Sequence, residues 1–206
     1  MSYRILGAVA LMAIVLGFVA CSQSNEEEYY PRPRDGERWE YKLEIMIPLQ
    51  GVQSGKMVVR TDGKETIGDY TYFKSVSVIS GIPGTEPEVV FSRWSSDGVY
   101  SIDGEHKDKP EYLSTPFPME VGKTWTIKKP KTQSEYRAEA IETLELFDQT
   151  YENCLKIAFK TKAGASLIEG TMYHAKGIGL VKESGVIKQG FGGGTPYEST
   201  LEKYKR

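Results

Sequence analysis

The stretch ERWEYKLEIMIPL, residues 37–49, decides the fold of this chain. Large apolar side chains stand at every second position of it. Because successive side chains of a β-strand point to opposite faces of a sheet, this alternation predicts a strand with one buried face. The alternating residues are Trp39, Tyr41, Leu43, Ile45 and Ile47. We therefore expect a mainly β protein.

Similar stretches follow as far as residue 204. Residues 134–146 alternate in the same way, and although their Ala, Glu and Leu content also favours a helix, we interpret them as a strand. The other predicted strands are residues 56–61, 71–80, 88–96, 99–102, 125–128, 154–161, 167–173, 179–183 and 198–204. About ten to twelve short strands are typical of one antiparallel sheet that is strongly curved or closed into a barrel or half-barrel. We expect a single β-rich domain over residues 37–206.

Asp-Gly pairs and prolines predict the connections between these strands. Asp97-Gly98 is a strong hairpin signal, and Asp62-Gly63 and Asp103-Gly104 predict two more turns. Residues 108–118 hold three prolines. Because proline lacks the amide hydrogen that a strand ladder needs, we expect a long irregular connection there.

The first twenty residues have the character of a secretory signal peptide. Arg4 provides a short basic region, and residues 5–20 form an apolar run. This run is shorter than the roughly 20 apolar residues that a membrane-spanning helix needs, although an uncleaved N-terminal anchor is the alternative. We predict that residues 1–20 are removed.

Residues 18–21, Phe-Val-Ala-Cys, resemble the lipobox of bacterial lipoproteins, in which the Cys is lipidated after cleavage. Phe18 departs from the usual Leu of that motif. The resemblance implies that Cys21 carries a diacylglyceryl group and usually an N-acyl chain, which together anchor a protein stably. Ser22, where an Asp would retain the protein at the inner membrane, implies an outer-membrane location facing the periplasm. The polar residues that follow predict a flexible tether, so that residues 21–36 link the lipid to the domain.

Composition argues against several classes of ligand. Without residues 1–20 the chain holds 25 basic and 28 acidic residues, so no basic field favours nucleic acid. Gly122-Lys123-Thr124 matches the end of a phosphate-binding loop, but Phe117 stands where the motif requires its first glycine. We therefore expect no nucleotide. The glycine-rich residues 190–194 are interpreted as a hairpin loop.

The cysteines and histidines do not predict a catalytic or metal site. If Cys21 is lipidated, Cys154 has no disulfide partner, and its apolar neighbours predict a buried, unreactive thiol. His106 and His174 are far apart and show no metal-ligand spacing. A pairing of Cys154 with His174, or of two carboxylates from distant strands, stays open as an enzymatic alternative. We expect no cofactor, no metal and no enzyme.

Three motifs in the second half resemble a family of uncharacterised bacterial lipoproteins. They are F-P-x-x-V-G-x-x-W at residues 117–125, N-C-x-K-I at 153–157 and G-x-G-L-V-K at 177–182. The resemblance covers roughly residues 110–185 and implies fold and location, with no enzymatic role. His174 is an extra residue relative to the family pattern.

The motifs also have a structural interpretation. Gly122 predicts the tight turn that leads Trp125 into the core, and Gly177 and Gly179 predict a bend that needs positive φ. By distant fold analogy with periplasmic lipoprotein carriers, a curved sheet of this kind has an open apolar face.

These observations lead to a functional hypothesis. We expect a non-catalytic binding or interaction module of the cell envelope, anchored in membrane lipid through Cys21. Its partner is either an apolar small molecule in a cavity or a protein of an envelope complex, in which the chain is a structural subunit.

The first prediction concerns the anchor. With Cys21 intact the protein should fractionate with membranes, whereas Cys21→Ser should move it to the soluble periplasmic fraction, because the acyl chains are lost. Fractionation followed by immunoblotting measures this. An identical distribution of the two proteins would contradict lipidation at Cys21.

Overall fold

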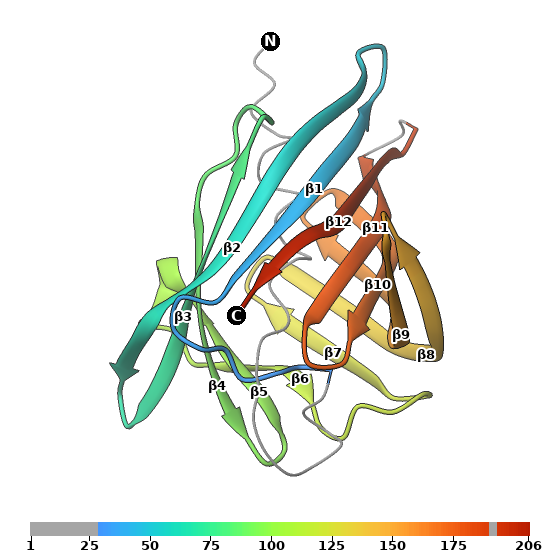
Figure 1. Ribbon diagram of the computed structural model, residues 1–206. Helices are drawn as coiled ribbons and strands as arrows, with labels where there is room; N and C mark the ends of the chain where they lie inside the picture. The colour runs from blue at the N-terminus through green and yellow to red at the C-terminus, as the bar shows by residue number, and fades with distance from the viewer. Residues whose placement is uncertain (1–28, 190–192) are drawn as a thin grey trace.

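The computed structural model describes residues 29–189 and 193–206, and most of these residues form antiparallel β-sheet (Figure 1). Cys21 and the predicted signal peptide lie outside the described residues. The strands are β1 (Arg38–Ile47), β2 (Gly51–Ile67), β3 (Tyr70–Ser80), β4 (Glu88–Ser95), β5 (Gly98–Asp103), β6 (Tyr112–Pro116), β7 (Thr124–Lys129), β8 (Thr132–Leu146), β9 (Gln149–Ala163), β10 (Ser166–Ala175), β11 (Gly179–Gln189) and β12 (Thr195–Lys205), with one 3-10 turn, η1 (Gly104–His106). The described residues contain no helix of the length and apolarity that a bilayer crossing requires.

All twelve strands belong to one sheet, in the order β6-β5-β4-β3-β2-β1-β12-β11-β10-β9-β8-β7. Two meanders, β1 to β6 and β7 to β12, are therefore joined side by side through the antiparallel pair β1–β12. The sheet curls so that its edge strands β6 and β7 approach each other, which makes a nearly closed barrel. The predicted mainly β, curved single domain is confirmed.

The inner face of β1 follows the alternation that predicted it. Trp39, Tyr41 and Leu43 are each 1% exposed, while the residues between them face outward. The Trp39 indole Nε1 donates a hydrogen bond to the backbone oxygen of Ile178 at 3.0 Å. The Tyr41 hydroxyl donates to the backbone oxygen of Leu180, also at 3.0 Å. These two contacts tie β1 to the start of β11.

The ambiguous residues 134–146 lie within β8, so the choice of strand over helix was right. The proline-rich residues 108–118 were predicted wrongly as wholly irregular, because they contain β6. The reason is that β6 is an edge strand, where proline is tolerated because one side of the strand needs no ladder partner. Pro116 ends that strand.

Asp62-Gly63 does not form the predicted turn. The pair lies inside β2 as a β-bulge, since the register with β3 shifts between Thr61 and Lys64. Gly63 has a φ of +77°. The backbone of Thr61 pairs here with the segment before β1, because Gly36 N donates to Thr61 O at 3.1 Å. In contrast, Asp97-Gly98 closes the predicted hairpin between β4 and β5.

Residues 29–36 are not a free tether, so the predicted boundary at residue 37 needs correction. Tyr29 and Tyr30 are 7% and 0% exposed. The Tyr30 ring stacks on His174 of β10, with ring centroids 4.6 Å apart. The segment crosses one end of the barrel toward the β10–β11 turn (Figure 1), and we call it the strap. Two tyrosines can bury there because they add apolar area to the core. Residues 21–28 lie outside the described residues.

Glu37 fixes the C-terminal end of the strap. This carboxylate is 3% exposed and accepts hydrogen bonds from Arg34 N at 2.8 Å and from the Tyr204 hydroxyl at 2.5 Å. Arg206 lies 3.3 Å from the same carboxylate. The strap is thereby attached to the last strand.

The seam between β6 and β7 is bridged by side chains. The Trp125 indole donates to Ser114 O on β6 at 3.2 Å, and Lys123 Nζ donates to Phe117 O at 3.2 Å. Trp125 also stacks on Tyr136 with centroids 5.0 Å apart. Trp125 is therefore one of the side chains that join the two edges of the sheet.

The second prediction tests this seam. Trp125→Phe should lower the free energy of unfolding by about 1 kcal/mol more than Trp94→Phe, because only the first change removes a hydrogen bond. Trp94 is a matched control, since it is also half-buried against the core and its indole nitrogen has no hydrogen-bond partner. Urea unfolding measures both changes. Equal losses would show that the indole hydrogen bond does not stabilise the seam.

Candidate functional site

The residues predicted from motifs have structural roles. Gly122 has a φ of +94°, and its amide donates to Ala138 O at 2.8 Å, which confirms the predicted turn. Trp125 is half-buried rather than fully buried, because it covers the seam. Gly177 and Gly179 have φ values of +72° and +91° and form the predicted bend between β10 and β11.

Cys154 is buried, as predicted. It is 0% exposed, and its Sγ donates to Tyr151 O at 3.4 Å. Burial raises the pKa of this thiol to about 11, so little thiolate exists at neutral pH. This environment is the opposite of what a nucleophilic cysteine needs.

His174 does not form a catalytic pair with Cys154. The imidazole is 0% exposed, and neither ring nitrogen makes a hydrogen bond of normal geometry. Burial lowers the pKa of His174 to about 3. The Tyr29 backbone favours the protonated ring and therefore partly opposes this shift. His106 is exposed in η1. Within residues 29–189 and 193–206, no three His, Cys, Asp or Glu side chains gather as a metal site would require.

The barrel encloses a polar group that motif analysis missed. Glu183 of β11 is 0% exposed, and its Oε1 accepts a hydrogen bond of 2.6 Å from the Tyr197 hydroxyl of β12. Its Oε2 has no hydrogen-bond partner among the described residues, and neither has the hydroxyl of Ser199. Ser199 is also 0% exposed and lies directly opposite Glu183 in the β11–β12 ladder. We call Tyr41, Tyr136, Glu183, Tyr197 and Ser199 the interior polar cluster.

The electrostatics of the cluster centre on Glu183. Burial raises the pKa of this carboxyl to about 7, although the Tyr197 hydrogen bond opposes the shift. Burial raises the pKa of Tyr136 to about 12, and the charge of Glu183 adds to it. The pKa of Tyr41 is raised for the same two reasons. Side chains from β1, β8, β11 and β12 therefore share one buried environment.

Glycine positions Tyr197 within the cluster. Gly185 lies opposite Tyr197 in the ladder, and a Cβ atom there would stand 3.0 Å from the Tyr197 ring and 3.1 Å from its hydroxyl. The absence of a side chain at Gly185 lets the ring lie across β11, which brings the hydroxyl to Glu183. Gly170, the neighbour of Gly185 on β10, is covered in the same way by Phe159.

One sequence signal for this site existed. In the predicted strand 179–183, Glu183 is two positions from Val181 and shares its face of the sheet, whereas Lys182 lies on the opposite face. A charged residue at an inward position is rare and costly unless it is paired. The alternation therefore indicates that Glu183 points inward, but it does not show which residues Glu183 contacts.

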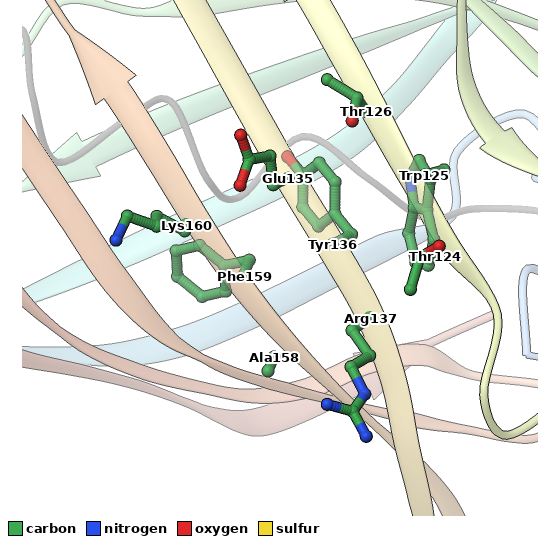
Figure 2. Close-up of a pocket in the computed structure, with 9 residues that line it drawn as sticks. All are labelled: Thr124, Trp125, Thr126, Glu135, Tyr136, Arg137, Ala158, Phe159 and Lys160. Atoms are coloured by element: carbon green, nitrogen blue, oxygen red, sulfur yellow. The ribbon is translucent and has the colours of Figure 1, made fainter.

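An open depression of about 500 Å³ lies over β7, β8 and β9. Figure 2 shows the cross-strand row Trp125, Tyr136 and Phe159 in this region. The alternating positions that also line it are exposed or half-buried and carry mixed charge: Thr124, Thr126, Glu135, Arg137, Ala158 and Lys160. Lys160, which lines the depression, is paired with Glu169 at 2.7 Å.

A second polar network has a structural explanation. Arg93 donates to Glu111 through Nε at 2.7 Å, and the Tyr72 hydroxyl donates to the same carboxylate at 2.6 Å. The Arg93 guanidinium also lies over the rings of Tyr70 and Tyr100. These contacts hold the segment before β6 against β3 and β4, and they leave the carboxylate satisfied.

The comparisons with known proteins give weak similarities. No family model matches the chain, and no curated protein matches it. The chain is similar to a candidate exported protein with a YmcC-like fold from Bacteroides fragilis (14% identity, TM-score 0.44, covering 84% of this chain and 97% of that one). It is also similar to a candidate lipoprotein from Parabacteroides distasonis (13%, 0.41, 86% and 98%) and to a LolA superfamily protein from Nitrosomonas europaea (9%, 0.27, 84% and 86%). These values are too low to carry an argument about fold or function.

The third prediction uses the pKa of Glu183. Because the folded-state pKa of about 7 lies above the value of 4.5 expected for an unfolded carboxyl, the folded protein loses stability as pH rises between these values. Glu183→Gln should remove this loss. Relative to wild type, the variant should gain about 2.5 kcal/mol between pH 5 and pH 8.

The measurement is the free energy of unfolding in urea at both pH values. His174 and Glu88 also titrate, but they are present in both proteins, so their contributions cancel in the difference. A constant difference across this range would show that Glu183 is ionised normally in the folded state.

Proposed function

We propose that this chain is a lipid-anchored, non-catalytic binding protein of the bacterial envelope, and that the interior of its barrel holds an apolar small molecule. The anchor is Cys21, and the location is the outer membrane facing the periplasm. Both follow from the lipobox resemblance and from Ser22.

The observation that carries the proposal is the strand count of a nearly closed sheet. Barrel diameter grows with strand number, and about eight strands give an interior that side chains just fill. Twelve strands enclose more space. The inner face is mainly apolar and aromatic, as the buried positions Leu43, Ile157, Phe159, Met172 and Leu201 illustrate. A twelve-strand barrel with an apolar inner face favours an apolar ligand.

The chemistry of the described residues supports a non-catalytic role. Cys154 and His174, the pair that the sequence left open, are each held in the form that suits packing rather than catalysis. The thiol stays protonated and the imidazole stays neutral at pH 7. Neither has the hydrogen-bonded base that an activated nucleophile needs.

One observation favours the alternative role of a structural subunit. The β1–β2 hairpin extends beyond its neighbours (Figure 1), because β12 pairs with β1 only as far as Ile45 and β3 pairs with β2 only from Lys56. Its tip exposes Met46, Leu49 and Val52, whose exposed fractions are 51%, 108% and 54%. An exposed apolar tip is typical of a protein contact.

The fourth prediction tests the ligand. The Cys21→Ser chain, secreted with its own signal peptide, can be purified without detergent. Native mass spectrometry should then show a retained apolar molecule. Ala138→Leu should reduce its occupancy, because Ala138 is 0% exposed on the inner face, whereas Ala158→Leu on the outer face should not.

Thermal unfolding provides the control. If the interior holds removable ligand, Ala138→Leu should be tolerated. If protein side chains fill the interior, the added volume should cost about 1–3 kcal/mol. A ligand-free mass for the parent protein, together with strong destabilisation by Ala138→Leu, would refute the proposed function and favour the structural role.

A further inference from the structure

We infer that the interior polar cluster is a head-group site, and that the bound molecule is an amphiphile whose polar end donates hydrogen bonds, such as a hydroxyl or an ammonium group. This inference rests on the proposed function, since it specifies the polar end of the molecule that is proposed to occupy the barrel interior. It adds the chemical class of that ligand.

The first step is the position of the unpartnered atoms. Glu183 and Ser199 are direct cross-strand neighbours, and both are 0% exposed. Directly opposite residues on one face of an antiparallel pair have their side chains close together. Glu183 Oε2 and Ser199 Oγ therefore offer two unused hydrogen-bonding atoms at one place on the inner wall.

The second step asks whether the hydrogen-bonding atoms of the cluster that have no partner are donors or acceptors. The Tyr197 hydroxyl donates its hydrogen to Glu183, and the Tyr41 hydroxyl donates its hydrogen to Leu180 O. The cluster thus retains acceptor capacity at Glu183 Oε2, and the unpartnered Ser199 hydroxyl can both accept and donate. A head group that donates hydrogen bonds complements this arrangement.

The third step concerns charge. The buried polar residues that the structure describes are Glu37, Thr61, Ser77, Ser101, Ser114, Thr115, Thr132, Ser134, Thr161, His174, Glu183, Ser199 and Thr200. No Lys or Arg is among these described buried residues. A carboxylate or phosphate head group would therefore meet a buried carboxyl without a cation to balance it, which is unfavourable.

The fourth step concerns the surroundings. One cross-strand row runs along the inner wall through β8, β9, β10, β11, β12 and β1. Its members are Ala138, Ile157, Met172, Glu183, Ser199 and Leu43, each at most 1% exposed. The polar pair is therefore flanked on both sides by apolar side chains. This arrangement suits a ligand with one polar end and an apolar body.

The experiment compares three probes of equal chain length: dodecylamine, 1-dodecanol and dodecanoate. Each is titrated at pH 7.5, below its aggregation limit, into the detergent-free Cys21→Ser protein stripped of ligand, by displacement of a fluorescent apolar dye. The amine and the alcohol should bind at least about tenfold more tightly than dodecanoate, as expected for hydrogen bonds to a carboxyl.

Variants then locate the site. Glu183→Gln should weaken dodecylamine about tenfold or more, because the charged partner is lost, and should change 1-dodecanol much less. Glu198→Gln is the matched control, since Glu198 lies next to Ser199 on the opposite face of β12 and pairs with Lys182 at 3.0 Å. Ser199→Ala provides a second test within the cluster, and circular dichroism confirms folding of each variant.

The outcomes separate the two proposals. If all three probes bind equally and Glu183→Gln changes none of them, the interior binds apolar molecules but the head-group site is wrong. If dodecanoate binds most tightly, the inference is also wrong. If no probe binds, the proposed function itself fails.

Discussion

The antiparallel pairing of β1 with β12 is the interaction on which the rest of the structure depends. Each six-strand meander can form from local hairpins, but the β1–β12 pair brings the first and the last described strand together in one sheet. Long-range pairing has a higher entropic cost than hairpin formation, because a long loop must close. The inward side chains of β1 offset this cost by packing into the core and by donating to carbonyl groups at the start of β11.

The same pairing creates the interior polar cluster. Glu183 and Ser199 lie opposite each other only because β11 and β12 are neighbours, and Tyr41 approaches them only because β1 completes the wall. The burial of a carboxyl is unfavourable unless its hydrogen bonds are satisfied. Tyr197 satisfies one oxygen, and the other oxygen defines the chemistry that a ligand must bring. The stability of the barrel and its proposed binding function are thus linked through one side chain.

Prediction from the sequence succeeded where the physical cause was local. Alternation located eleven of the strands, since it depends only on neighbours along the chain. Positive φ at Gly122, Gly177 and Gly179 was predictable from the same local rules. The errors arose where distant segments decide the outcome. β6 forms within a proline-rich segment because it is an edge strand. Asp62-Gly63 becomes a bulge because the strap pairs with Thr61, and the strap folds because His174 and Glu37 hold it.

The sequence by itself determined that this chain is a β protein with one buried face on most strands and with a lipobox-like Cys near its start. These properties depend on side-chain periodicity and on short motifs, which are visible without any contact. Only the tertiary structure decided that the strands close into a barrel, that Tyr30 packs inside it and that Glu183 meets Ser199 and Tyr197. The physical reason is that strand order and register bring together residues far apart in the chain, and alternation specifies the face of a residue but not its neighbours.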